Sequence, residues 1–586
     1  MKTFLKMFLA AILGCVVAFL LGFLILMGIG VSALSTDKTV VISPESVLKL
    51  DLNCTILERT NDNPFENYNF PGYEQEKTIG LNTLSSMIKH AKEDDNIKGI
   101  YLDISAIRAS PATVEELRNY LLDFKTSGKF IYCYSDAMTQ LSYYLATASD
   151  KIFFHPEGMI DFRGFVAEIH FYKKLLEKIE LDMQIVRHGT YKSAVEPFML
   201  EKMSEANREQ IQTYLNSMWG HVAANISKSR SIDIETINNT CDSLLFTSDI
   251  KVALNRGFVD ELIYLDQFYD LVREELKIDA EKEINWVSMK DYKNAVPQPK
   301  TKTDKIAIIY AAGVIQNVKG GNEIIGYSIA DEIAKARKDK DVKAIVFRVN
   351  SGGGSALMSE SIWREVDLAR QVKPIVVSMG DYAASGGYYV SAASSYIVAQ
   401  PTTITGSIGV LGIIPNAEKL LANKLGITVD RVKTNEHSDA ISVTRSMDNY
   451  ERSVMQNMVE KVYSTFVKRV ADGRELTTSY VDTIGQGRVW SGIDALNIGL
   501  VDTLGGLNVA IEKAAQLAEI TNYSISERPA MKGVFETIME SFTETKISAK
   551  MQKSHLYQTY TYFNFVESAL ELKGVQARIP YTLDIR

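Results

Sequence analysis

Short hydrophobic runs rich in β-branched residues alternate with amphipathic stretches over most of the chain. The runs that predict strands lie at residues 99–104, 129–134, 305–310, 344–349 and 374–378. Between the last two runs and after them, residues 359–370 and 388–394 have the pattern of helices. Strands that alternate with helices form a parallel sheet whose faces the helices cover. The pattern therefore predicts an α/β fold.

The first half of the chain repeats the second half. Placing Ile97 on Val342 gives an offset of 342 − 97 = 245 residues, and at this offset Asp136 falls on Asp381 without a gap. The register holds over about seventy positions, which is the signature of an internal repeat. The sequence therefore predicts a tandem duplication of one α/β domain.

The N-terminus carries a long uncharged run. Lys2 and Lys6 precede residues 7–34, which contain no charged side chain. A helix of about 20 apolar residues crosses a bilayer, and flanking lysines stay on the cytoplasmic side. This predicts a transmembrane anchor with the bulk of the chain outside the cytoplasm. A signal peptide cleaved near residues 31–33, a lipoprotein signal at Cys15 and a buried core helix are the alternatives; the length and the flanking charge favour the anchor.

These features divide the chain into five segments. Pro297 and Pro299 stand among charged residues, as expected of a linker between the repeats. The C-terminal stretch has no counterpart in the first copy and is expected to form a helical tail. The predicted segments are a cytoplasmic stub with the anchor (1–36), the first repeat (37–280), the linker (281–304), the second repeat (305–526) and the tail (527–586).

Length and charge narrow the classes of function. A chain of 586 residues is too long for a single core. Its net charge of -8 argues against a nucleic-acid partner, because binding phosphates requires a basic surface. The four cysteines are widely scattered and no HExxH motif occurs, so neither a metal nor another cofactor is expected.

The segment GDYAASGGYY at residues 380–389 gives the strongest local signal for chemistry. A strand leads into a turn of small residues, and a helix is predicted to begin near Ser385. A serine at this position has an exposed hydroxyl beside backbone N–H groups that stabilise developing negative charge. Gly386 and Gly387 leave room for a substrate backbone. The alternative is a serine that only caps the helix.

A second signal is the segment NSGGGS at residues 350–355, directly after a predicted strand. Glycines at the carboxyl end of a parallel strand form ligand sites in α/β folds, and their N–H groups can complete an oxyanion hole. A phosphate-binding loop is the competing interpretation, but no GxxxxGK[ST] motif is present. A plain turn is the other alternative.

A third signal is the segment YKSAVEPF at residues 191–198 in the first copy. Lys192 can act as a base only when it is neutral, and burial among apolar neighbours lowers a lysine pKa. Ala194, Val195 and Phe198 are suitable neighbours. An ordinary surface lysine is the alternative.

The repeat connects the three signals, because each half lacks what the other half has. At the offset of 245, Ser385 falls on Gln140, and the glycines 352–354 fall on residues 107–109. After the register slips by one residue, Lys192 falls on Ser438. One complete Ser–Lys pair therefore remains, split between the halves, which requires the two copies to pack face to face.

Two further residues are candidates for this site. His437 could serve Ser385 as a base in a Ser-His-Asp arrangement, although no G-x-S-x-G motif surrounds the serine. Ser407, in the segment TGSIG, could hydrogen-bond near the lysine or could be a turn serine.

These motifs resemble the long, duplicated form of the signal peptide peptidase A family, peptidase family S49. The resemblance implies a ClpP/crotonase-like fold and a serine protease with a Ser–Lys dyad, in which Ser385 is the nucleophile and Lys192 the general base. It implies that Gly353 and Gly386 supply the oxyanion-hole amides. The family commonly has proline where this chain has Gly352, which loosens the loop.

The same resemblance implies a location and a partner. It places the protein in the bacterial inner membrane as a single-pass protein with its catalytic bulk in the periplasm. There a bowl-shaped homo-tetramer degrades signal peptides left after export, along with other unfolded or apolar peptides. A crotonase-type acyl-CoA enzyme and a non-catalytic membrane scaffold are the alternatives from other classes; neither requires a Ser–Lys pair.

Overall fold

A computed structural model of the protein describes most of the chain after the N-terminus. The described residues are 14, 22, 41–60, 77–296, 304–317, 324–531 and 575–578. Apart from residues 14 and 22, the predicted anchor at residues 7–34 lies outside these ranges, as does most of the predicted tail. Among the helices within them, none combines the length and the hydrophobicity that a bilayer crossing requires.

The first half forms a parallel six-stranded sheet in the order β8-β6-β5-β4-β1-β9. Alternating apolar residues bury both of its faces, and the larger core lies under helices α2 and α3. The strands are β1 (Ser46–Asp51), β4 (Ile97–Asp103), β5 (Phe130–Thr139), β6 (Lys151–Asp161), β8 (Glu261–Leu262) and β9 (Asn285–Ser288). The helices are α2 (Leu81–Glu93), α3 (Pro111–Lys125), α4 (Gln140–Ala146), α8 (Ile234–Asp242), α9 (Lys251–Asn255), α10 (Leu265–Leu276) and α11 (Met289–Ala295).

The second half forms an eight-stranded sheet that is parallel except at its β17–β19 edge. Its order is β19-β17-β15-β13-β10-β21, with β16 and β20 extending from β15. The strands are β10 (Lys305–Ala312), β13 (Val342–Ser351), β15 (Ile375–Ala384), β16 (Tyr396–Ala399), β17 (Ile404–Gly406), β19 (Val489–Ser491), β20 (Thr503–Leu504) and β21 (Ser524–Arg528). The helices are α12 (Tyr327–Lys338), α13 (Ala356–Arg370), α14 (Gly386–Ser391), α15 (Asn449–Arg474), α16 (Thr478–Ile484), α17 (Gly492–Asn497) and α18 (Leu507–Leu517).

The two sheets share one topology. The run β5-β4-β1 of the first sheet matches β15-β13-β10 of the second, and β4 and β13 begin 245 residues apart, as the sequence offset predicts (342 − 97). Each run is followed at the same edge by a parallel strand from later in the chain, β9 or β21. The predicted α/β fold and its duplication are therefore confirmed.

A third sheet joins the halves. Strand β7 (Asp182–His188) of the first half pairs antiparallel with β18 (Val410–Asn416) of the second along its whole length. The order is β12-β11-β14-β22-β18-β7, completed by β11 (Val314–Ile315), β12 (Ile324–Ile325), β14 (Gly353–Ser355) and β22 (Val575–Arg578). A small sheet pairs β2 (Thr55–Leu57) with β3 (Thr78–Gly80), and the remaining helices are α5 (Lys173–Ile179), α6 (Glu196–Met199) and α7 (Glu205–Arg230).

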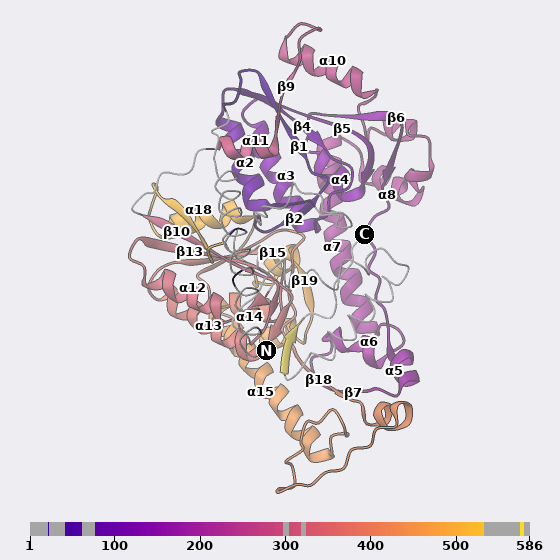
Figure 1. The fold of residues 1–586 in the computed structure, drawn as a ribbon, viewed down its shortest axis with the longest axis vertical. Helices are drawn as coiled ribbons and strands as arrows, with labels where there is room; N and C mark the ends of the chain where they lie inside the picture. The colour runs from indigo at the N-terminus through magenta and orange to yellow at the C-terminus, as the bar shows by residue number, and fades with distance from the viewer. Residues whose placement is uncertain are drawn as a thin grey trace, which may run out of the picture.

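Figure 1 shows the first-half sheet above the second-half sheet, with α7 running down beside both. The side chain of Ser217 on α7 hydrogen-bonds that of Ser491 at the end of β19, at 2.8 Å. The two halves therefore meet face to face along a long interface, as the split Ser–Lys pair requires.

Two segments differ from the sequence prediction. The predicted linker at 281–304 contains β9 and α11, because Val287 and Tyr292 are apolar residues that pack into the first core. In the predicted helical tail at 527–586, none of the described residues is helical: β21 runs on to Arg528, and β22 is a strand of the third sheet. Both strands are stabilised by pairing with partners far away in the sequence, which local patterns do not reveal.

Candidate active site

Ser385 lies where strand β15 gives way to helix α14. Its backbone has φ 55°, in the left-handed region that a non-glycine residue rarely adopts, at a cost of about 1–3 kcal/mol. The turn is held because the Ser385 N–H donates to the Gly406 carbonyl at 2.8 Å and the Tyr389 N–H donates to the Ser385 carbonyl at 2.8 Å. The predicted strand-to-helix turn at this serine is therefore present.

The prediction that the serine hydroxyl is exposed was wrong. The Ser385 side chain is fully buried, because a lysine of the first half packs over it. The Lys192 Nζ donates to Ser385 Oγ at 2.7 Å. It also lies 3.0 Å from the Ser407 Oγ and 3.2 Å from the Ser407 carbonyl oxygen. The structure therefore brings the two predicted residues, 193 positions apart in the sequence, into direct contact.

The surroundings of Lys192 favour a neutral amine. The side chain is fully buried, and its three polar contacts are all with uncharged oxygen atoms. Burial holds the pKa of Lys192 well below the usual value for a lysine. A Cβ on Gly487 would lie 2.6 Å from the Lys192 Cβ, so the lysine stem requires a glycine there. A lysine in this setting can accept a proton from the neighbouring hydroxyl.

Several contacts hold the Lys192 loop against the second half. The Tyr191 N–H donates to the Gln486 carbonyl at 2.8 Å, next to the β7–β18 pairing. From α7, the Gln210 amide donates to the Tyr191 carbonyl at 3.0 Å and accepts from the Val489 N–H at 3.2 Å. Gln210 is buried, and no local pattern predicted its role, because Tyr191 and Val489 come from two separate segments of the chain.

The predicted glycine loop lies beside the serine. Strand β13 ends at Ser351, and Gly353 and Gly354 adopt φ values of 98° and 154°. A Cβ on Gly387, in α14, would lie 2.4 Å from the Ser351 carbonyl oxygen, so the loop and the helix start touch at glycine. Gly386 is the first residue of α14, where N–H groups have no acceptor within the helix. The Gly353 N–H donates to Ser351 Oγ at 3.1 Å.

An extended segment of the chain runs past this loop. Strand β22 lies between β14 and β18 and pairs antiparallel with both. Gly353 is opposite Arg578 in this pairing, and Leu411 is opposite Gln576. The space beside the glycine loop therefore accepts a polypeptide in extended conformation.

The equivalent position in the first copy has a structural role. Gln140 stands where Ser385 stands in the second copy, at the first position of α4. Its side-chain oxygen accepts from the backbone N–H groups of Arg163 and Gly164, at 3.0 and 2.7 Å. Ser438, the counterpart of Lys192, is exposed.

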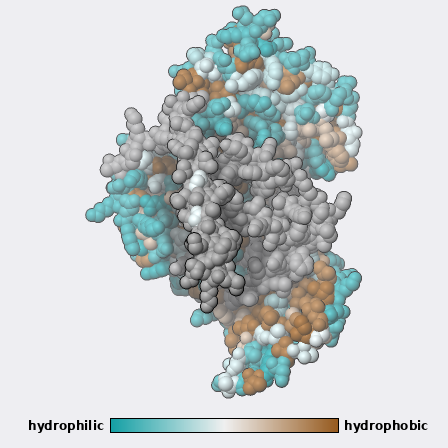
Figure 2. Space-filling model, in the orientation of Figure 1, coloured by the Kyte–Doolittle hydropathy of each residue, from teal (hydrophilic) through white to brown (hydrophobic). Residues whose placement is uncertain are grey.

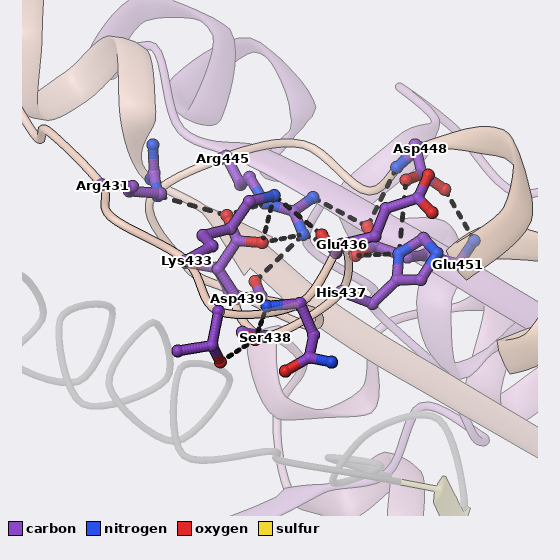
Figure 3. Close-up of polar contacts among 12 residues, drawn as sticks. Arg431, Lys433, Glu436, His437, Ser438, Asp439, Arg445, Asp448 and Glu451 are labelled. Atoms are coloured by element: carbon purple, nitrogen blue, oxygen red, sulfur yellow. Dashed lines mark hydrogen bonds and ion pairs between the residues drawn. The ribbon is translucent and has the colours of Figure 1, made fainter.

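The alternative base, His437, belongs to another cluster. It lies between β18 and α15, with its Nδ1 3.8 Å from carboxylate oxygens of Asp448 and Glu451 (Figure 3). Its ring is stacked on that of Tyr450. Ligand atoms of His437, Asp448 and Glu451 lie within 4.8 Å of one another, a grouping that the sequence spacing did not suggest. However, both Glu451 oxygens already accept from the Arg445 guanidinium, whose charge opposes a cation there (Figure 3).

Comparisons with known proteins agree with this architecture. The model of Peptidase family S49 matches the chain twice, at residues 123–279 and 367–521, once in each half. Protease 4 of Salmonella typhi is 36% identical over 466 residues, which cover 78% of this chain and 75% of that protein.

Two further relatives match over most of their length. Protease 4 of Haemophilus influenzae is 33% identical over 444 residues, covering 73% of this chain and 72% of that protein. The chloroplastic serine protease SPPA of Arabidopsis thaliana is 32% identical over 451 residues, covering 75% and 66%. The chain therefore belongs to peptidase family S49 and is a serine peptidase.

Proposed function

We propose that the protein is a membrane-anchored endopeptidase in which Ser385 is the nucleophile and Lys192 the general base. One observation carries this proposal: a fully buried lysine amine with uncharged neighbours lies 2.7 Å from the hydroxyl of a serine at a strained strand-to-helix turn. Nucleophile and base within hydrogen-bond reach are the signature of nucleophilic catalysis.

The geometry supports a two-step reaction. Neutral Lys192 takes the proton of Ser385 Oγ as that oxygen attacks the peptide carbonyl, and the resulting ammonium group donates the proton to the departing amine nitrogen. Lys192 then deprotonates a water molecule that attacks the acyl-enzyme, releasing the acid and restoring the serine hydroxyl. Throughout both steps, Ser407 offers oxygen atoms that accept hydrogen bonds from the ammonium group and hold it in place.

The oxyanion of each tetrahedral intermediate needs fixed donors. We assign these to the backbone N–H groups of Gly353, two residues after Ser351, and Gly386, directly before Gly387; Ser351 and Gly387 are where the glycine loop touches α14. One such donor typically lowers the barrier by about 3 kcal/mol. The Gly353 N–H would exchange its Ser351 Oγ partner for the oxyanion.

Substrates of this site are extended peptides. The pairing of β22 with β14 and β18 supports binding by strand addition, in which main-chain hydrogen bonds hold the peptide regardless of its sequence. Because β22 occupies the place between β14 and β18 beside the glycine loop, a substrate strand binds there by taking the place of β22. Signal peptides released after export, and other apolar or unfolded peptides, suit this mode of binding and the family resemblance.

A serine-reactive probe tests the site directly. A fluorophosphonate should label the wild-type protein once, with the modified peptide containing Ser385, and Ser385→Ala should not be labelled. Ser438→Ala, at the exposed serine that replaces the lysine in the repeat, is the matched control and should label fully. Labelling of a different serine with unchanged yield in Ser385→Ala would contradict the assignment.

The proposed location is the inner membrane, with the catalytic bulk in the periplasm and four copies in the assembly. The uncharged N-terminal run supports the anchor. Exposed apolar side chains between β18 and α15 support a contact surface; they include Leu425, Ile427 and Val432, and Figure 2 shows apolar residues gathered toward this lower end.

This location is tested with the full chain. It should stay in the membrane fraction at alkaline pH, and after extraction in detergent its protein mass should equal four chains. Removing residues 1–36 should release it from the membrane. Release of the full chain into the soluble fraction, or a monomer mass in mild detergent, would contradict the anchor or the tetramer respectively.

A further inference from the structure

At the contact between the two halves, each half caps a helix of the other. Ser110 precedes α3 but its side chain makes no cap hydrogen bond. Instead Asp381 of the second half accepts from the Thr113 N–H and the Thr113 hydroxyl, both at 2.9 Å. In return the side chain of Glu116, on α3, accepts at 2.7 Å from the Leu507 N–H at the start of α18. The N-cap residue of α18 is Gly506, which has no side chain to accept this hydrogen bond. A carboxylate at a helix N-terminus satisfies an otherwise orphaned donor and meets the positive end of the helix dipole.

A buried arginine joins the two caps. Arg348, on β13, is 1% exposed; its guanidinium lies 2.9 Å from a Glu116 oxygen and 2.8 Å from a Glu58 oxygen. The other Glu58 oxygen accepts from the Asn350 amide at 2.8 Å, and that amide also lies 3.2 Å from Asp381. Glu58, Thr113 and Glu116 of the first half and Arg348, Asn350 and Asp381 of the second half thus form one continuous set, the cross-cap network.

Two glycines leave the room that the carboxylates require. A Cβ on Gly380 would lie 2.6 Å from a Glu58 oxygen, and a Cβ on Gly506 would lie 2.7 Å from the Glu116 carboxyl group. Neither glycine has a left-handed backbone, so no turn requires its flexibility. A side chain at either position would therefore displace a carboxylate of the network from its place.

The network holds the ends of the two strands that lead to the active site. Asn350 lies near the end of β13, three residues before Gly353. Asp381 lies near the end of β15, four residues before Ser385. Here the ladder between the strands is irregular, because its register shifts between Val349 and Ser351. The Asn350 side chain closes this gap by accepting from the Tyr382 N–H at 3.1 Å.

The first copy has no equivalent of the residues that the second half contributes to the network. The counterpart of Asp381 is Asp136, which is exposed, and the counterpart of Arg348 is Asp103 (348 − 245). Burial raises the pKa of Asp381 and of Glu58. Three carboxylates held near one arginine are stabilised only if their hydrogen bonds stay in place. The first copy has no arginine at the position of Arg348 and only an exposed aspartate at that of Asp381, so these residues are not needed simply to build a sheet of this fold.

We propose that the cross-cap network is the positioning device of the active site: it locks the strands that bear the nucleophile and the glycine loop to the half that supplies the lysine. Asp381 and Glu116 are its positioning residues, since each contacts the opposite half while neither touches the reacting atoms. This inference rests on the proposed Ser–Lys dyad.

The test compares Asp381→Ala with Asp136→Ala, the repeat-related exposed aspartate. Asp381→Ala should lower kcat by about 10- to 100-fold, with KM changed much less, because a misplacement of about 1 Å costs such factors. It should also move the acid limb of the kcat profile to higher pH, because a loosened contact hydrates Lys192 and raises its pKa. Asp381→Asn retains an oxygen that accepts from Thr113 and should recover part of the rate; Asp136→Ala should match the wild type.

The inference is overturned if Asp381→Ala folds and its kcat, and the pH of the acid limb of its kcat profile, equal those of Asp136→Ala. If Asp381→Ala does not fold, Asp381→Asn and Thr113→Val are measured in its place. A kcat equal to that of the wild type in both variants then overturns the inference. Failure of the dyad itself is recognised separately: Lys192→Met would then keep its activity, whatever Asp381 does. A circular dichroism spectrum and a melting temperature for each variant separate misfolding from mispositioning.

Discussion

Lys192→Met should lower kcat/KM for peptide hydrolysis by about four orders of magnitude, because catalytic groups that act as a unit lose nearly all of their effect when one is removed. Methionine is unbranched and takes the place of the lysine stem beside Gly409 and Gly487, so the fold should remain intact. Ser385→Ala should reach the same residual rate, and the double variant should be no slower than either single variant. Steady-state hydrolysis of a fluorogenic apolar peptide measures all three.

His437→Ala is the matched control for the identity of the base. This histidine lies on the segment between β18 and α15, stacked on Tyr450, and it should retain wild-type kcat/KM. The opposite pattern, with an active Lys192→Met and an inactive His437→Ala, would show that the histidine is the base. Equal loss in both would mean that the β18–α15 segment supports the site in a way that the dyad does not describe.

The sequence predicted the parts of this protein that depend on local pattern. The alternation of strands and helices predicted the α/β fold, and the match between the halves at an offset of 245 residues predicted the duplication, because both patterns are visible in the order of residues alone. Ser385 was recognisable because a strand, small residues and a helix start lie next to one another. Lys192 was recognisable because it stands in a short segment of apolar residues, where a lysine is unusual.

What the sequence did not predict depends on partners far apart in the chain. The Thr113–Asp381 hydrogen bond joins residues 268 positions apart, and neither residue differs locally from an ordinary cap or loop residue. The same holds for β9 and β22, which become strands by pairing with distant edges. Burial of Ser385 was missed for this reason also, since the group that covers it belongs to the other half.

The pH dependence of kcat/KM gives the second large effect. Only the neutral amine of Lys192 accepts the Ser385 proton, so activity should rise with pH, by about tenfold per unit below the lysine pKa, and then level off. Because burial lowers this pKa, the plateau should begin well below the pH at which a free lysine loses its proton. An acid limb that continued to the ordinary pKa of lysine would show that the amine is solvated when it acts.

The same ionisation should appear in stability, which provides a check that does not depend on substrate. The unfolded chain binds a proton on Lys192 at a pH where the buried amine does not, so the unfolded state is favoured as pH falls from the ordinary lysine pKa toward the lowered one. Over that window the wild type should lose free energy of unfolding relative to Lys192→Met, and below it the difference should become constant. Denaturant unfolding of both proteins across the alkaline range measures this difference. Parallel curves would mean that the lysine has the same pKa in the folded and unfolded states, and the proposed base would then lack its physical basis.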